Sequence, residues 1–177
     1  MITFRPATDD DFPAIWAIFQ AIIAEGDTYV QDETFAAEQG RQMWLGPGVL
    51  TMIALDEGQV VGAYKILPNQ TGRGAHVANG SYIVRAGLRG RGIGRQMVVD
   101  SLRAARAAGY RAIQFNFVVS TNRGAVKLYE DLGFRILATL PEAFRHPSQG
   151  YVDAYVMHRW LADQPAGDPT SSGSGQA

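Results

Sequence analysis

The stretch "VRAGLRGRGIGRQMVV", Val84 to Val99, alternates glycines with arginines and then begins an apolar helical pattern. Glycine has no Cβ, so the backbone of such a loop can come close to a ligand. The first N–H groups of a helix have no acceptors within the helix, and arginines add charge-assisted hydrogen bonds. Three alternating glycines between a strand and a helix therefore predict a site for an anion, in preference to a tight loop with solvated arginines.

Two well-known phosphate loops do not fit this stretch. A P-loop needs Lys and then Ser or Thr after its second glycine, but Ile93 and Gly94 follow Gly92. A dinucleotide-binding fingerprint needs glycine at position 95, where the chain has Arg95. The stretch therefore predicts neither a nucleoside triphosphate site nor a dinucleotide site.

Helical and extended patterns follow one another on both sides of this loop. The spacing of apolar residues predicts helices over 9–26, 33–45, 93–108 and 121–132. Strands are predicted over 1–8, 49–56, 59–67, 77–84, 110–119, 134–140 and 151–161. This order predicts an α/β (α+β) domain with one mixed sheet and helices on both faces. Gly80 interrupts the strand 77–84, which indicates a bulge or a close backbone approach.

Composition bounds the class of protein. The 177 residues are 46% hydrophobic, which fits one domain, and we assign it to 1–161. The segment 162–177 has no apolar residue larger than alanine and is expected to be a disordered tail. A net charge of -1 gives no general attraction to nucleic acid, and no apolar run is long enough for a membrane span. With no signal-peptide pattern at the start, we expect a cytoplasmic protein.

Two motifs resemble those of a known family. "VRAGLRGRGIG" resembles motif A of the GNAT (GCN5-related) N-acetyltransferases, V-x-P-x-x-[RQ]-G-x-G-[IL]-[GA], with Ala86 in place of the frequent proline. "NRGAVKLYEDLGF" is similar to the later family motif N-x-x-A-x-x-x-Y-x-x-x-G-F. The motifs stand in the family's order, with the expected helix and strand between them.

The resemblance implies acetyl-CoA as co-substrate, no metal, and a GNAT fold. That fold is a mostly antiparallel sheet of six to seven strands with one splayed parallel pair, and Gly80 is the residue expected to supply the bulge that opens it. The pyrophosphate is expected on the glycine loop and the pantetheine arm beside the preceding strand. The residues so implied are Tyr82, Ile83, Val84, Arg89, Gly90, Arg91, Gly92, Ile93, Gly94, Arg95, Asn122 and Tyr129.

Transfer of an acetyl group to an amine needs a proton donor for the leaving thiolate. Tyr129 lies on the expected inner face of its helix, and the resemblance implies that it is this general acid; the plain alternative is a core tyrosine. Asn122 suits a helix N-cap, and the family's asparagine at this position also binds the pantetheine arm.

The general base is less well indicated. Many relatives place a glutamate on the strand equivalent to 77–84, which has none here. The candidates are His76, Asp153 and an ordered water, and for the two side chains simple solvent exposure is the alternative. Asp27 and Tyr29 precede the second helix, in a segment that lines the acceptor pocket of many relatives.

Two asparagines bear on the acceptor. Asn116 lies in an apolar strand with Ile113 and Phe115 on its other face, so we expect it to be buried with partners. Asn79 lies beside Gly80 in the neighbouring strand. "LPNQTGRGAHVANGSYIV", "FNFVVSTN" and "YVDAYV" are similar to segments of the fungal azetidine-2-carboxylate N-acetyltransferases, in which the equivalent asparagines are thought to position the substrate.

We therefore interpret the chain as an acetyl-CoA-dependent N-acetyltransferase of a small amine, such as an amino acid or an analogue. Its catalytic candidates are Tyr129, Asn116, Asn79 and Asp153. A protein or peptide acetyltransferase and a non-catalytic acetyl-CoA-binding module remain as alternatives. Homodimers are common in the family, but the sequence indicates no interface.

Overall fold

The computed structural model describes residues 1–161, and the tail expected at 162–177 lies outside the described residues. The strands are β1 (Thr3–Pro6), β2 (Leu50–Asp56), β3 (Gln59–Pro68), β4 (Val77–Val84), β5 (Ala112–Val119), β6 (Arg135–His146) and β7 (Gly150–Trp160). The helices are α1 (Phe12–Glu25), α2 (Ala37–Leu45), α3 (Ile93–Ala107) and α4 (Arg123–Asp131), with short 3-10 turns η1 (Asp9–Asp11) and η2 (Gly72–Gly74). The predicted order of helices and strands is confirmed.

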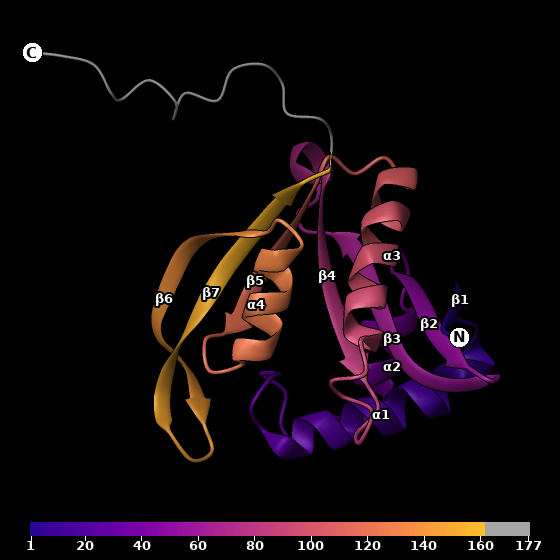
Figure 1. The fold of residues 1–177 in the computed structure, drawn as a ribbon, viewed down its shortest axis with the longest axis horizontal. Helices are drawn as coiled ribbons and strands as arrows, with labels where there is room; N and C mark the ends of the chain where they lie inside the picture. The colour runs from indigo at the N-terminus through magenta and orange to yellow at the C-terminus, as the bar shows by residue number, and fades with distance from the viewer. Residues whose placement is uncertain (162–177) are drawn as a thin grey trace, which may run out of the picture.

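All seven strands belong to one sheet, in the order β1-β2-β3-β4-β5-β7-β6. Every neighbouring pair is antiparallel except β4 and β5, which are parallel. Helices α3 and α4 cover one face, while α1 and α2 cover the opposite face of the N-terminal strands (Figure 1). The fold is thus the predicted mixed sheet with helices on both faces.

Apolar stripes on the helices explain this layering. Helix α1 buries Ile15, Phe19 and Ile22 against strands β2 to β4, together with Trp44 of α2. On the other face, Met97 and Val98 of α3 are buried beneath that helix. Because each helix buries one face and leaves the other in water, burial of apolar surface holds the helices on the sheet.

The parallel pair β4–β5 is short. Only Val77 with Ala112 and Ala78 with Ile113 are in register, and beyond them the two strands diverge (Figure 1). The gap separates an N-terminal half of the sheet, β1 to β4, from a C-terminal half, β5 to β7. The predicted splayed pair is therefore present.

The prediction of a bulge at Gly80 is wrong. Strand β4 runs in unbroken register with β3 from Ala78 to Val84. The alternative prediction, that other groups approach the backbone of Gly80 closely, agrees with the structure. A Cβ at this position would lie 3.3 Å from the Tyr82 hydroxyl oxygen and 3.4 Å from Cε1 of Phe115. Gly80 thus makes room for two aromatic side chains beside the opening.

The irregularity lies in β5 instead. The register of β5 with β7 shifts between Phe115 and Val118, which inserts one extra residue into β5. The strict alternation expected for this strand therefore ends at Phe115, and Asn116 is exposed. The prediction that Asn116 is buried is wrong, because the bulge carries it out of the regular ladder.

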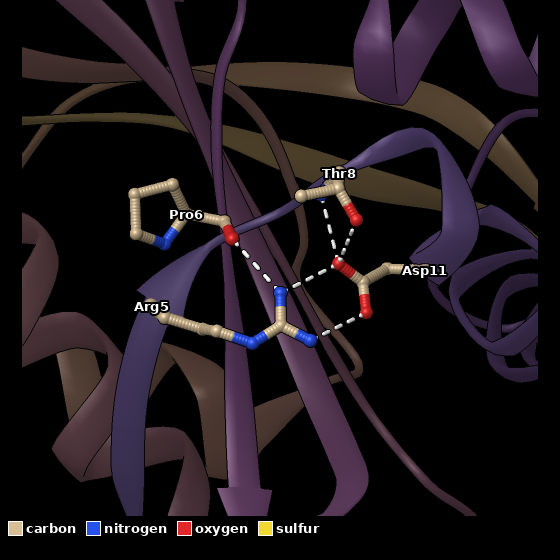
Figure 2. Close-up of polar contacts among 4 residues, drawn as sticks. All are labelled: Arg5, Pro6, Thr8 and Asp11. Carbon is tan, nitrogen blue, oxygen red and sulfur yellow. Dashed lines mark hydrogen bonds and ion pairs between the residues drawn. The ribbon is translucent and has the colours of Figure 1, made fainter.

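A polar cluster joins the first strand to the first helix. Both guanidinium NH2 groups of Arg5 donate to the carboxylate of Asp11, at 2.7 and 2.8 Å (Figure 2). The N–H and hydroxyl of Thr8 donate to the same carboxylate, at 2.8 and 3.0 Å. These donors, Arg5 foremost, lower the pKa of Asp11 to about 2. The cluster fixes the turn that leads from β1 into α1.

Among residues 1–161, no helix combines the length and the apolar character needed to cross a membrane.

Candidate active site

The glycine loop between β4 and α3 adopts a backbone that side chains disfavour. Gly87, Gly90 and Gly92 have φ angles of 79°, 80° and 78°. Nothing lies within 4 Å of a Cβ built on any of them, so glycine is needed here for its conformation rather than for packing. The first hydrogen bond of α3 runs from the Gln96 N–H to the Gly92 carbonyl. The amides of Ile93 to Arg95 therefore have no partner within the helix.

A cavity of about 690 Å³ opens at this loop. The beginnings of α3 and α4, the end of β4 and the segment after α1 enclose it. Its basic residues are Arg89, Arg95, Arg123 and His146. Arg89 also donates to the carboxylate of Glu25 at 2.6 Å, which joins the loop to the end of α1. Arg91, predicted with this group, is exposed and lies outside the cavity wall.

The backbone of β4 faces the opening at every second residue. Backbone hydrogen bonds of Val77 and Arg85 run to the β3 side. Because the direction alternates along an antiparallel strand, the amides of Gly80, Tyr82 and Val84 face the side from which β5 has diverged. The side chain of Ile83, another predicted cofactor contact, is buried in the core beneath α1.

Tyr129 lies where two cavities meet. It borders the 690 Å³ cavity and a second cavity of about 210 Å³ in the opening between β4 and β5. Its ring centroid lies 4.6 Å from that of Phe115 and 6.1 Å from that of Tyr82. Among residues 1–161 its hydroxyl has no hydrogen-bond partner, and burial raises the pKa of Tyr129, which keeps the proton on the phenol at neutral pH.

Asn122 borders both cavities as well. Its Oδ1 accepts the Ala125 N–H at 3.2 Å, so the predicted N-cap of α4 is confirmed. The preceding residue, Thr121, has a buried Oγ1 without a hydrogen-bond partner in the described part of the chain, and it lines the 690 Å³ cavity. No sequence motif singled out Thr121.

The 210 Å³ cavity brings together the two asparagines. Asn79 uses its Oδ1 to accept the Gly80 N–H at 2.7 Å. Asn116 donates to Oδ1 of Asn69 at 2.6 Å and accepts from Gln114 at 2.9 Å. In the described chain the wall of this cavity contains no Asp, Glu, His, Lys or Arg.

Tyr29 connects the segment after α1 to the opening. Its hydroxyl donates to the Tyr82 carbonyl at 3.1 Å, and its ring packs edge-on against Phe19 at 5.0 Å. Burial raises the pKa of Tyr29, so this donor stays protonated. The contact joins residues 53 positions apart, so no local sequence pattern predicts it.

The predicted bases lie elsewhere. Oδ1 of Asp153 accepts the Glu142 N–H at 3.0 Å, and Asp153 lines neither of these cavities. His76 is exposed beside the Arg73 carbonyl and also lies outside both walls. Asp27 does line the larger cavity, where it accepts the Thr28 hydroxyl at 2.8 Å. The opening itself therefore offers amides and hydroxyls rather than a carboxylate.

Comparison with known proteins adds three findings. Residues 13–134 match the family model "Acetyltransferase (GNAT) family". A GCN5-related N-acetyltransferase from Kribbella flavida is 47% identical, with a TM-score of 0.86 over 90% of this chain and 97% of that one. The phosphinothricin acetyltransferase Pat from Sinorhizobium meliloti, solved in complex with acetyl-CoA, has a TM-score of 0.82 at 21% identity over 97% and 94% of the chains.

The N-acetyltransferase aca1 of Schizosaccharomyces pombe is 37% identical over 98 residues, 55% of this chain. The match covers 47% of that relative, so the chain spans about half the length of this curated protein.

Proposed function

The chain belongs to the acetyltransferase (GNAT) family, and from this premise we propose that it transfers the acetyl group of acetyl-CoA to a small-molecule amine. The observation that carries the proposal is the junction of two cavities at Tyr129. One cavity begins at the glycine loop, and the other occupies the opening between β4 and β5. A cofactor held in the first can meet an amine held in the second.

The larger cavity fits acetyl-CoA in three respects. Its unpaired helix amides and arginines suit the pyrophosphate. The outward amide and carbonyl of Val84 suit the amide groups of a pantetheine arm. The Thr121 hydroxyl, which has no hydrogen-bond partner in the described chain, is a further polar group in the cavity wall. A buried hydroxyl without a partner is unfavourable, and a bound ligand can supply that partner.

Acetyl-CoA supplies a thioester carbonyl open to attack by an amine. An N–H that faces the opening, such as that of Tyr82, suits the carbonyl oxygen as negative charge develops on it. Tyr129 is the proton donor that we assign to the departing thiolate, because its hydroxyl is protonated and has no partner within the described chain.

The uncharged wall of the 210 Å³ cavity bears on deprotonation of the amine. An alkylamine has a pKa near about 10, so most of it is protonated at neutral pH. Taking an ammonium into a site without a charged partner lowers its pKa and favours the neutral, reactive form. We infer that a water takes the proton, since neither Asp153 nor His76 borders this cavity.

We further propose an amino acid or an analogue as acceptor, with Asn79 and Asn116 as its polar contacts. The small volume of the inner cavity supports a small acceptor. The name of the Sinorhizobium meliloti protein, a phosphinothricin acetyltransferase, supports the same class.

The test is release of free thiol from acetyl-CoA across a panel of acceptors. The panel holds phosphinothricin, azetidine-2-carboxylate, L-proline, L-methionine, spermidine and a short peptide with a free amino terminus. We expect turnover with at least one of the amino acids and little with the peptide. Turnover of the peptide alone would favour a peptide acetyltransferase. Binding of CoA without turnover of any acceptor would favour a binding module.

A further inference from the structure

Gln31 is a half-buried residue whose side-chain oxygen Oε1 is buried and has no hydrogen-bond partner in the described chain. Three buried side-chain polar atoms lack a partner within residues 1–161: Gln31 Oε1, Trp44 Nε1 and Thr121 Oγ1. Trp44 is enclosed in the core, and Thr121 borders the cofactor cavity. Gln31 is the one of the three that borders the inner 210 Å³ cavity. A buried acceptor without a donor is unfavourable, so this oxygen is ready for a ligand's N–H or O–H.

The segment that carries Gln31 is held in place. Tyr29, two residues earlier, donates its hydroxyl to the Tyr82 carbonyl at 3.1 Å. Asp32, the residue directly after Gln31, accepts hydrogen bonds from the N–H and the hydroxyl of Thr34, at 2.9 and 2.5 Å. The Tyr29 contact therefore joins the chain to β4 two residues before Gln31, and the Asp32 contacts form a local turn directly after it.

Gln31 also lies between two cavities. It borders a third cavity of about 470 Å³, which shares Tyr29, Val30 and Gln31 with the inner one. The outer cavity contains charged side chains of both signs, whereas the inner wall has none within the described chain. The charged residues are Asp32, Glu33 and Arg145, and His146 lies in the same wall. The uncharged inner wall suits an amino group in its neutral form, and the outer wall suits charged groups of the same molecule.

On the basis of the proposed function, we propose that Gln31 is the residue that selects the amine that receives the acetyl group. Its Oε1 accepts a hydrogen bond from the N–H of the incoming amine, and the charged remainder of the acceptor lies against the side chains of the outer cavity. A carbonyl oxygen only accepts, so the ligand has to present a donor, and the N–H of an amine is such a donor. The acceptor class is a primary or secondary amine on a charged body, as in a zwitterionic amino acid.

The ring of His146 is suited to the same acceptor. Its Nδ1 accepts the Ser148 N–H at 3.2 Å, so a neutral ring carries its proton on Nε2. His146 borders the outer cavity together with Arg145. Both side chains are donors that suit the carboxylate of an amino acid.

The experiment compares Gln31→Met and Gln31→Glu with wild type. The methionine variant keeps the volume of the side chain and removes the acceptor, while the glutamate variant keeps an acceptor oxygen. Gln20→Met on the exposed face of α1 is the matched control. Initial rates are measured with the amino acid of the panel that wild type uses best. Binding of CoA and of each panel amino acid to the CoA complex is measured by calorimetry.

We expect Gln31→Met to raise the amine KM at least about tenfold while the affinity for CoA and the melting temperature stay near wild type. Gln31→Glu should retain more of the amine affinity, and Gln20→Met should match wild type. An unchanged amine KM in Gln31→Met would overturn the role of Gln31 and leave the proposed function standing. If wild type neither binds nor acetylates any amine of the panel, both proposals fall. If Gln31→Met does not fold, the test passes to Gln31→Ala, which also removes the acceptor oxygen, and a wild-type amine KM in that variant overturns the role of Gln31.

Discussion

At the scale of single residues, Tyr129 carries the sharpest prediction. Tyr129→Phe removes one hydroxyl and keeps the ring contacts with Phe115 and Tyr82. We expect kcat to fall by roughly 10²-fold or more, because a positioned proton donor contributes about that much. The KM for acetyl-CoA should change little. Steady-state rates check this, with Tyr155→Phe as control, since Tyr155 packs against the same core and borders neither cavity. Unchanged turnover would remove Tyr129 from the mechanism.

Lys65 illustrates the opposite case, a buried charge outside the proposed chemistry. It is 6% exposed on β3, its Nζ lies 5.7 Å from the centroid of the Trp44 ring, and burial lowers its pKa to about 8. The unfolded chain, with a lysine pKa of 10.5, binds more protons between these values, so stability rises with pH there. The charged form is therefore unfavourable in the folded protein below pH 8.

Lys65→Met should raise the free energy of unfolding at pH 7 by about 1–3 kcal/mol. The advantage of the variant should shrink as the pH rises from about 8 to 10.5, because wild type then loses the buried charge. Urea unfolding of both proteins at pH 7 and pH 10 measures the difference. An advantage for the variant that is equal at both pH values would show that the charge is not the cause.

At the scale of secondary structure, the junction of β1 with α1 depends on one carboxylate. Asp11→Asn loses the paired guanidinium of Arg5, and at pH 7 we expect a loss of about 1–2 kcal/mol in the free energy of unfolding. The folded pKa of Asp11, about 2, lies below the ordinary pKa of an aspartate, 3.8. The stabilisation is therefore complete above about pH 4 and disappears as the pH falls through 2.

Denaturant unfolding of wild type and Asp11→Asn from pH 7 down to pH 2.5 tests this dependence. The exposed neighbour Asp10 provides the control Asp10→Asn, which should match wild type throughout. A constant gap between Asp11→Asn and wild type across this range would contradict the assignment to the Arg5 ion pair.

At the scale of the whole molecule, the sheet consists of two halves that meet in a short parallel register. The N-terminal half contributes the glycine loop, and the C-terminal half contributes Asn122 and Tyr129 to the same cavity. A ligand in that cavity contacts both halves and binds only the folded chain. At 100 times its Kd, acetyl-CoA should raise the free energy of unfolding by about 2.7 kcal/mol, which corresponds to roughly 5–10 °C in Tm.

Gly92→Ala should suppress this ligand-dependent shift. Alanine disfavours the φ of 78° at the start of α3, so the amides of the loop lose their arrangement at a cost of about 1 kcal/mol to the free protein. Thermal unfolding with and without acetyl-CoA measures both quantities. A shift equal to that of wild type would show that the loop does not hold the cofactor.

Much of the fold follows from local patterns. Apolar residues at helical spacing predicted α1 to α4, and the glycine spacing predicted the loop between β4 and α3. The strand-loop-helix pattern is local because its cause is local: positive φ and unpaired helix amides depend on neighbouring residues only. The N-cap role of Asn122 was predictable for the same reason.

Local spacing predicted which elements form and where glycines open the loop before α3, since both depend on residues within about a dozen positions of one another. Which side chains line the opening between β4 and β5 depends on the tertiary structure. The bulge lies in β5 rather than at Gly80, so Asn116 is exposed at the cavity rim. Asp153 accepts the Glu142 N–H where the register of β6 with β7 shifts. Tyr29 meets Tyr82 across 53 positions, and Gln31 reaches the cavity through that contact. Such pairings depend on how strands register and helices pack, which no short stretch of sequence encodes.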